Sequence, residues 1–294
     1  MNKIILTIGV TLAMLLGLSA CDKEAHKDEN GLVVNIVMPG DDAVSDVRLW
    51  VYKSDGLLVG EYHHADMKQL SSSALALDAG EYVLIAATNL VTPFSTNQAI
   101  GDGIKPYEGL AFTLNDASAS PAHAHYGVQQ VTVKGDAFTH TEVAMSRILA
   151  ELQFIIKGVP ANVVKAEAKV TNVAKSFLPY SSQLIPMTDI ADLGSVTPKD
   201  GVISFPMKRL MPVVNAQSRA GIDAVPTLLQ FTFWYDNGET ITFHAEAPAI
   251  ENGGTYTPEV VYDVFRPGMT VTITTINGWR KGETNEWVIL NPNN

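Results

Sequence analysis

Apolar and polar residues alternate in short runs from residue 32 onward, a pattern typical of strands. In residues 47–52, Val47, Leu49 and Val51 fall on one face, and a polar or aromatic residue follows each of them. Asp55-Gly56 then predicts a hairpin turn into residues 57–62, and Asp236-Asn237-Gly238 predicts a second hairpin. Further strands are predicted at residues 32–38, 82–88, 128–134, 139–145, 148–157, 229–235, 239–246, 269–276 and 287–290.

Two kinds of segment are less clear. Residues 161–176 are rich in Ala, Lys and Glu, which favours a helix, but they contain a Val-Thr-Asn-Val stretch that favours a strand, so both remain open. Residues 91–125 and 178–227 lack periodicity and are predicted to form long loops. Many short strands separated by turns predict an all-β protein, and 294 residues suggest two β-sandwich domains, with a boundary near Ser146-Arg147.

The N-terminus has the features of a bacterial lipoprotein signal. Lys3 precedes an uncharged apolar stretch at residues 4–17. A helix of that length spans roughly 21 Å, which is too short for a hydrocarbon core of about 30 Å. Leu18-Ser19-Ala20-Cys21 resembles a lipobox, so residues 1–20 are predicted to be a signal peptide and Cys21 the lipid-attachment residue. The alternative is an ordinary secretory signal in which the cysteine falls at this spacing by chance.

The overall composition excludes several classes of protein. Lys and Arg total 20 and Asp and Glu total 31, and a net charge of −11 argues against nonspecific nucleic-acid binding. Cys21 is the single cysteine, which rules out disulfide frameworks and Cys-rich metal sites. Residues 21–31 are charged and have no large apolar side chain, so they are predicted to form a solvated tether.

No residue pattern indicates catalysis. The chain contains no GxSxG, HExxH, P-loop or GxGxxG motif. His123-Ala124-His125 and His63-His64 lack an obvious third metal ligand and are predicted to be surface or turn histidines. Asp41-Asp42 is predicted to be a solvated turn pair. The sequence therefore predicts no enzyme activity, catalytic residue, cofactor or metal.

Four segments carry a family resemblance. Residues 47–52 with Asp55-Gly56, residues 77–90, residues 143–152 and residues 266–273 resemble stretches of the FimB-type fimbrial anchor subunits of Bacteroidia type V pili. Asp78-Ala79 stands where that family usually has a proline before the glycine. The resemblance implies two transthyretin-like β-sandwich domains in tandem, at residues 32–146 and 147–294, after the signal peptide and tether.

The resemblance also implies a test within the family. Shaft pilins of this class are trimmed at an arginine in the loop after the first strand, which opens a groove that a neighbour's strand fills. Here no Lys or Arg occurs from Asp28 to Val47, and Arg48 lies inside the predicted second strand. The first strand and the lipid are therefore expected to stay. Both suit an outer-membrane lipoprotein that anchors the base of a fimbria and joins the first shaft subunit, or fimbrillin.

Two other functions remain open at this point. One is a shaft or tip subunit trimmed by another protease. The other is a glycan-binding surface lipoprotein, since Trp50, Trp234, Trp279 and Trp287 could stack on sugars. Trp50 and Trp234 alternate with apolar neighbours, which favours packing, whereas Trp279 and Trp287 are candidates for an interface with the next subunit.

Overall fold

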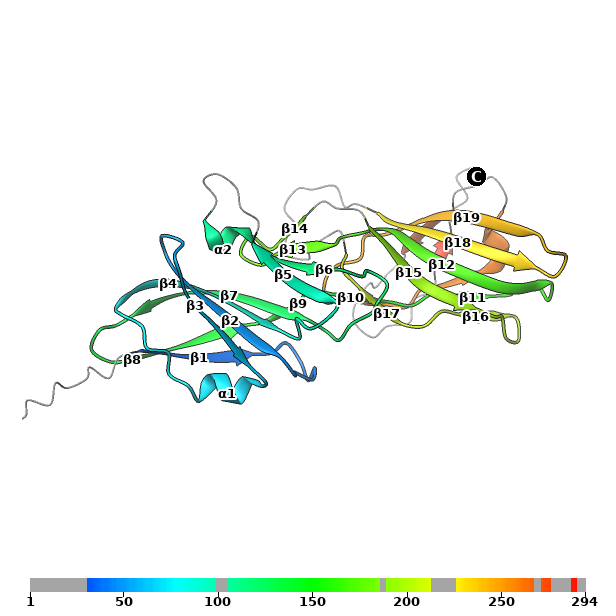
Figure 1. Ribbon diagram of the computed structural model, residues 1–294. Coiled ribbons are helices and arrows are strands. Elements are labelled where there is room, and N and C mark those ends of the chain that lie inside the picture. Colours follow the sequence, from blue (N-terminus) through cyan, green and yellow to red (C-terminus); the bar gives the residue numbers. More distant parts are fainter. Residues whose placement is uncertain are drawn as a thin grey trace, which may run out of the picture.

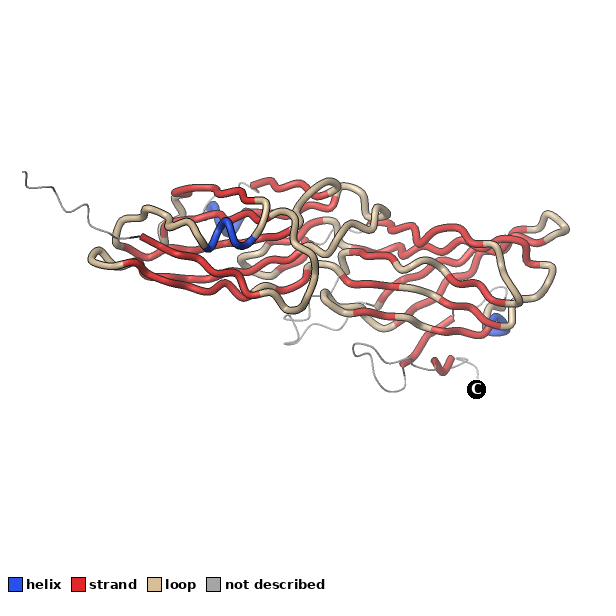
Figure 2. Tube along the Cα trace, turned by 90° about the horizontal axis from the view of Figure 1, so that it is seen from below, coloured by secondary structure: helices blue, strands red, loops and turns tan. Residues whose placement is uncertain are grey.

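A computed structural model of the chain describes residues 31–98, 105–185, 189–212, 226–266, 271–275 and 287–289. Strands form nearly all of its regular structure, which confirms the all-β class. The strands gather into two lobes that lie end to end in an elongated molecule (Figures 1 and 2). The predicted signal peptide, Cys21, residues 22–30 of the tether and Trp279 lie outside the described residues.

The first lobe has three layers. Its central sheet has the order β3-β2-β4-β7-β9, one outer layer pairs β1 with β8, and the other has the order β14-β13-β6-β5. Helix α1 lies on the side of β1 and helix α2 on the side of β5 (Figure 1). The bounds are β1 Gly31–Val37, β2 Val47–Lys53, β3 Leu58–His64, α1 Met67–Ser71, β4 Gly80–Thr88, β5 Phe94–Gln98, α2 Pro106–Gly109, β6 Leu110–Leu114, β7 His125–Val133, β8 Phe138–Ala144, β9 Ser146–Arg147, β13 Ser176–Leu178 and β14 Gln183–Ile185.

Strand β2 runs through the middle of this lobe, and its alternating residues explain the layers. Val47, Leu49 and Val51 pack into the core shared with β1 and β8. Trp50 and Tyr52 pack into the opposite core, where Trp50 lies 5.7 Å from Phe112 of β6 between ring centroids. Both faces of the strand are therefore buried, as the aromatic residues on its second face permit.

The second lobe is a two-layered sandwich. A six-stranded sheet of order β15-β12-β18-β19-β22-β23 faces two short sheets of order β17-β10-β20 and β16-β11-β21. Edge-to-face rings fill the core between them, with Phe231 at 5.3 Å from Phe154 and 5.2 Å from Phe265. The bounds are β10 Ala150–Leu152, β11 Ile155–Lys157, β12 Val163–Val173, β15 Asp189–Val196, β16 Val202–Ser204, β17 Lys208–Leu210, β18 Thr227–Tyr235, β19 Thr240–Ala247, β20 Thr255–Tyr256, β21 Glu259–Val261, the 3₁₀ turn η2 Tyr262–Val264, β22 Val271–Thr275 and β23 Trp287–Ile289.

Both predicted hairpins are present. Strands β2 and β3 pair antiparallel around Asp55-Gly56, and β18 and β19 pair around Asp236-Asn237-Gly238. Gly56 and Gly238 have φ values of +101° and +85°, a backbone region that favours glycine. The turn residues thus fixed these two pairings locally.

Other segments differ from the sequence prediction. The ambiguous residues 161–176 contain strand β12, whose Ala166 and Ala168 are buried against the opposite layer. The strand predicted at 148–157 is broken into β10 and β11. The long loops predicted at 91–125 and 178–227 contain β5, β6, β14, β15, β16 and β17. All of these except β6 lie at sheet edges, where little periodicity is needed.

One strand, β13, pairs with the other lobe and bears on the predicted domain boundary. Strand β13 pairs with β6, with Phe177 opposite Phe112, so residues 176–185 belong to a sheet of the first lobe although they follow β12 in the chain. The division at 146/147 stays a prediction. Among the residues that the structure describes, no helix is long and apolar enough to cross a membrane.

Candidate functional site

The first strand is seated along its whole length. Strand β1 runs parallel to β8 in unbroken register from Gly31–Phe138 to Val37–Ala144. Every second side chain points into the core, so Leu32 and Val34 are fully buried and Ile36 is 8% exposed. On the other edge, the backbone of Leu32 exchanges hydrogen bonds of 2.9 and 2.8 Å with Leu75. The alternation of residues 32–38 thus places an apolar face on the lobe, and the strand predicted there is present as β1.

The loop after this strand, residues 38–46, is fastened by Asn89. The Asn89 side chain donates to the carbonyl of Ala43 at 2.8 Å and accepts from the N–H of Ser45 at 3.0 Å. Its own backbone N–H donates to the carbonyl of Asp46 at 2.9 Å. Asn89 is 2% exposed and has φ = +57°, a conformation that asparagine tolerates better than most residues. One buried residue therefore holds the loop at three points, two through its side chain and one through its backbone.

Asp42 provides the second fastening and corrects the prediction of a solvated pair. Its carboxylate accepts two hydrogen bonds from the Arg147 guanidinium, at 2.6 and 2.7 Å, and lies 2.9 Å from His125 Nε2. The Arg147 hydrogen bond, opposed by burial, holds the pKa of Asp42 well below its usual range. Asp41 beside it is exposed. The two carboxylates diverge, as adjacent residues of an extended segment do, and one of them meets a partner 105 residues away.

The His123-Ala124-His125 segment is also a correction, because both rings are buried rather than at the surface. His125 is fully buried between Asp42 and Thr88, whose hydroxyl lies 3.0 Å from Nδ1. With a proton on Nε2, the neutral ring donates to Asp42 and accepts from Thr88. Burial is the main cause that lowers the pKa of His125 and of His123, so both rings favour the neutral form.

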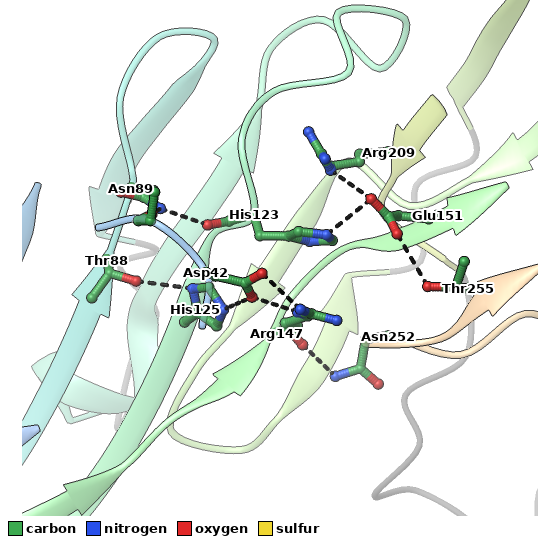
Figure 3. A network of polar contacts seen from close by, with 11 residues as sticks. Asp42, Thr88, Asn89, His123, His125, Arg147, Glu151, Arg209, Asn252 and Thr255 are labelled. Carbon is green, nitrogen blue, oxygen red and sulfur yellow. Dashed lines mark hydrogen bonds and ion pairs between the residues drawn. The ribbon is translucent and has the colours of Figure 1, made fainter. Parts of the chain in front are cut away.

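His123 faces the second lobe. Its Nε2 lies 3.1 Å from Glu151 of β10, and the same carboxylate accepts from Arg209 of β17 at 2.9 Å and from Thr255 of β20 at 3.1 Å. The backbone carbonyl of His123 accepts a hydrogen bond from the side chain of Asn89 at 2.8 Å. Figure 3 shows these contacts running from Thr88 and Asn89 to Thr255. The polar network therefore joins the loop after the first strand to the contact between the lobes.

The other predicted sites are placed as follows. His63 Nε2 lies 2.6 Å from the buried carboxylate of Asp46. Within the described ranges, no group of three or more His, Cys, Asp or Glu residues could hold a metal ion. Trp50 is 3% exposed and packs in the core, and Trp234 lies under the ammonium of Lys165 at 4.4 Å. Trp287 begins β23.

Sequence reasoning missed Asn89, Arg147 and Glu151. Asn89 follows a long buried strand and Arg147 interrupts an apolar stretch, and both are unusual places for such residues. Those positions were the signal, but the partners lie 28 to 105 residues away and no local pattern names them.

A family model now adds to this geometry. The model of the fimbrillin-A associated anchor proteins Mfa1 and Mfa2 matches residues 35–283. The chain belongs to this family. Its role is accordingly fimbrial, at the cell surface and in association with other fimbrial subunits, and the family is one of fimbrial proteins rather than enzymes.

Solved structures share the fold of this family member. The fimbrial anchor protein Mfa2 from Porphyromonas gingivalis is 13% identical, with 88% of this chain and 96% of that chain covered and a TM-score of 0.51. An adhesin candidate from Bacteroides thetaiotaomicron is 15% identical over 73% of this chain and 80% of that chain, with a TM-score of 0.52. At such identities the likeness concerns the fold. No curated protein matches the chain.

Proposed function

We propose that this family member is an outer-membrane lipoprotein that anchors the base of a fimbria, with lipid on Cys21 and a strand-mediated contact to the first shaft fimbrillin. The observation that carries the proposal is the seated first strand. Strand β1 buries three apolar side chains, and the loop behind it contains no Lys or Arg for an arginine-specific protease. The loop is also held at Asp42 and at the contacts of Asn89, so its backbone is a poor fit to a protease cleft.

A retained first strand decides the direction of assembly. Strand addition needs a free edge whose N–H and C=O groups can pair with the incoming segment. In this lobe β8 and the buried face beside it are already occupied by β1. A subunit of this kind can donate a strand or contact its neighbour otherwise, but it has no vacated β1 groove to receive one. That property suits the first subunit of a fibre.

The shape of the molecule supports a polarity for the proposed anchor. The described chain begins at Gly31, at the outer end of the first lobe, and the second lobe lies at the opposite end (Figure 1). Ten residues from Cys21 to Gly31 reach at most about 35 Å, so a lipid on Cys21 keeps the first lobe near the membrane. We place the contact with the shaft on the second lobe for this reason. We also infer two domains that divide near residue 146, with β13 and β14 reaching back to the first.

Replacement of the lipidation residue tests the anchoring role. In the native host, Cys21→Ala is expected to shift fimbriae from the cell-bound fraction to the medium, measured by immunoblot of both fractions. Ser19→Ala is the matched control, because it keeps a small residue before Ala20-Cys21 and should leave the fimbriae on the cell. Fibres that stay cell-bound in Cys21→Ala would contradict the proposal.

Intact mass distinguishes the alternative within the family. For the protein isolated from membranes, we expect a mass that fits acyl chains on Cys21 and an uncut chain through residues 32–38. An unlipidated chain that begins between residues 40 and 50 would instead identify a trimmed shaft or tip subunit.

A further inference from the structure

The loop after the first strand reaches the second lobe by two separate routes. The first route runs through Arg147, whose guanidinium binds Asp42 while its backbone carbonyl accepts from the Asn252 side chain at 3.0 Å. Asp42 and Arg147 have side chains that are 18% and 20% exposed, so water competes only partly with this pair. A bidentate Arg–carboxylate pair fixes orientation as well as distance. The position of the loop and the position of Asn252 are thus set by the same residue.

The second route runs through Asn89 and His123. Asn89 holds the loop with its side-chain oxygen and donates to the His123 carbonyl at 2.8 Å. The His123 ring then meets Glu151, which binds Thr255 at 3.1 Å. Both routes end on the segment from Asn252 to Thr255, where backbone hydrogen bonds of 2.9 Å join Gly253 to Leu149 and Glu151 to Gly254.

We propose that this network couples the first strand to the joint between the lobes, so that a seated loop keeps the joint closed and an intact joint keeps the loop seated. The joint is defined here as the end of the second lobe that meets the first: the backbone pairing of residues 149–153 with 253–256, which lies within the second lobe and receives the contacts of His123 and Arg147. The coupling has a physical basis in burial. Replacement of the Asp42 carboxylate by an amide removes one of the two oxygens that Arg147 and the fully buried His125 share, so at least one of their N–H groups must find another partner or water. Such a rearrangement moves Arg147, whose backbone carbonyl also accepts a hydrogen bond from Asn252.

This inference goes beyond the anchoring role and holds whether or not Cys21 carries a lipid. Its consequence is mechanical. Removal of the first strand together with the loop would take Asp42 away and loosen the joint, whereas a subunit that keeps its first strand keeps its two lobes in a fixed arrangement. A subunit that transmits force from a fibre to a membrane gains from that rigidity.

Hydrogen exchange on the chain from residue 22 onward, which keeps every described residue, tests the coupling in both directions. Asp42→Asn alters the network at the loop, and Glu151→Gln alters it at the joint. In the described structure Glu151 makes no hydrogen bond to the loop, so an effect of Glu151→Gln on the loop must pass through the network. A coupling free energy is reciprocal. Each variant should therefore speed exchange at least about fivefold in both places: in β1 and the loop, and at the joint amides.

Two matched controls separate coupling from a change of charge. Asp41→Asn removes the neighbouring exposed carboxylate, and Glu167→Gln removes a second-lobe carboxylate that pairs with Lys165 outside the network. Both should exchange like the wild type in both places. If Asp42→Asn does not fold, Arg147→Lys makes the same test, since it keeps the charge but loses the fork.

The outcomes are distinct. Acceleration at both ends in both variants, with unchanged controls, supports the coupling. Acceleration confined to the end that carries the substitution overturns it, and so does an Asp41→Asn variant that matches Asp42→Asn.

Discussion

Leu32→Ala is the sharpest test of how the first strand is held. Leu32 is fully buried, and its backbone pairs with Thr139 on one side and Leu75 on the other. Truncation of a buried leucine to alanine costs about 2–5 kcal/mol, from lost apolar burial and from the cavity that remains. The backbone pairing survives the change, so the loss falls on packing alone.

A value of about 3 kcal/mol corresponds to a rise of about 100-fold in the opening equilibrium of β1, since each 1.4 kcal/mol is a factor of ten. Native-state hydrogen exchange of the amides of residues 32–37 measures that equilibrium directly. The matched variant is Val37→Ala, because Val37 lies in the same strand but is 43% exposed. It should change the equilibrium less than about threefold, as surface substitutions usually stay within 0.5 kcal/mol.

The comparison can fail clearly. If Leu32→Ala and Val37→Ala exchange alike, apolar burial is not what retains the strand, and the argument for a permanently seated β1 loses its physical basis. A uniform acceleration across both lobes would mean that β1 opens only when the whole chain unfolds.

Two further predictions concern His125, which contacts Asp42 of the loop, and Gly127, where β7 lies close to β8. The pKa of His125 is lowered in the folded protein, so below about pH 6.5 the unfolded chain takes up a proton that the buried ring resists, and stability decreases as the pH decreases. His125→Asn should therefore flatten the dependence of the melting temperature on pH between pH 7 and 5, whereas His140→Asn, at an exposed site, should not. Gly127→Ala should lower the melting temperature by several degrees, because its Cβ would lie 2.6 Å from the Ala144 carbonyl oxygen, whereas Gly40→Ala, with open space around its Cβ, should leave it unchanged.

Much of the local structure was predictable because it is encoded over a few residues. The alternation in residues 47–52 predicted a strand with two distinct faces, and the Asp55-Gly56 turn predicted its partner β3. The Asn237-Gly238 turn likewise predicted the pairing of β18 with β19. The segment that the sequence left open between helix and strand has a different feature. Strand β12 looked partly helical because its alanines and lysines favour a helix in isolation, and only burial between β15 and β18 makes it a strand.

The polar network shows where local information ends. Asp41 and Asp42 are identical in the sequence and differ completely in the structure, since one is exposed and the other binds Arg147 and His125. A carboxylate acquires a low pKa from a partner and from burial, and neither is a property of its neighbours in the chain. The sites of Asn89 and Glu151 follow the same rule, because their partners come from segments far away in the chain.

The sequence by itself determined the all-β character, the turns, the absence of basic residues from the loop after the first strand and the family resemblance. Those features depend on periodicity, on single turn residues or on simple presence and absence. The tertiary structure alone decided that β1 pairs with β8 in a separate layer, that β13 returns to the first lobe, and that Asp42 meets Arg147. These are long-range choices, in which burial and pairing between distant segments outweigh the weaker preferences of each segment on its own.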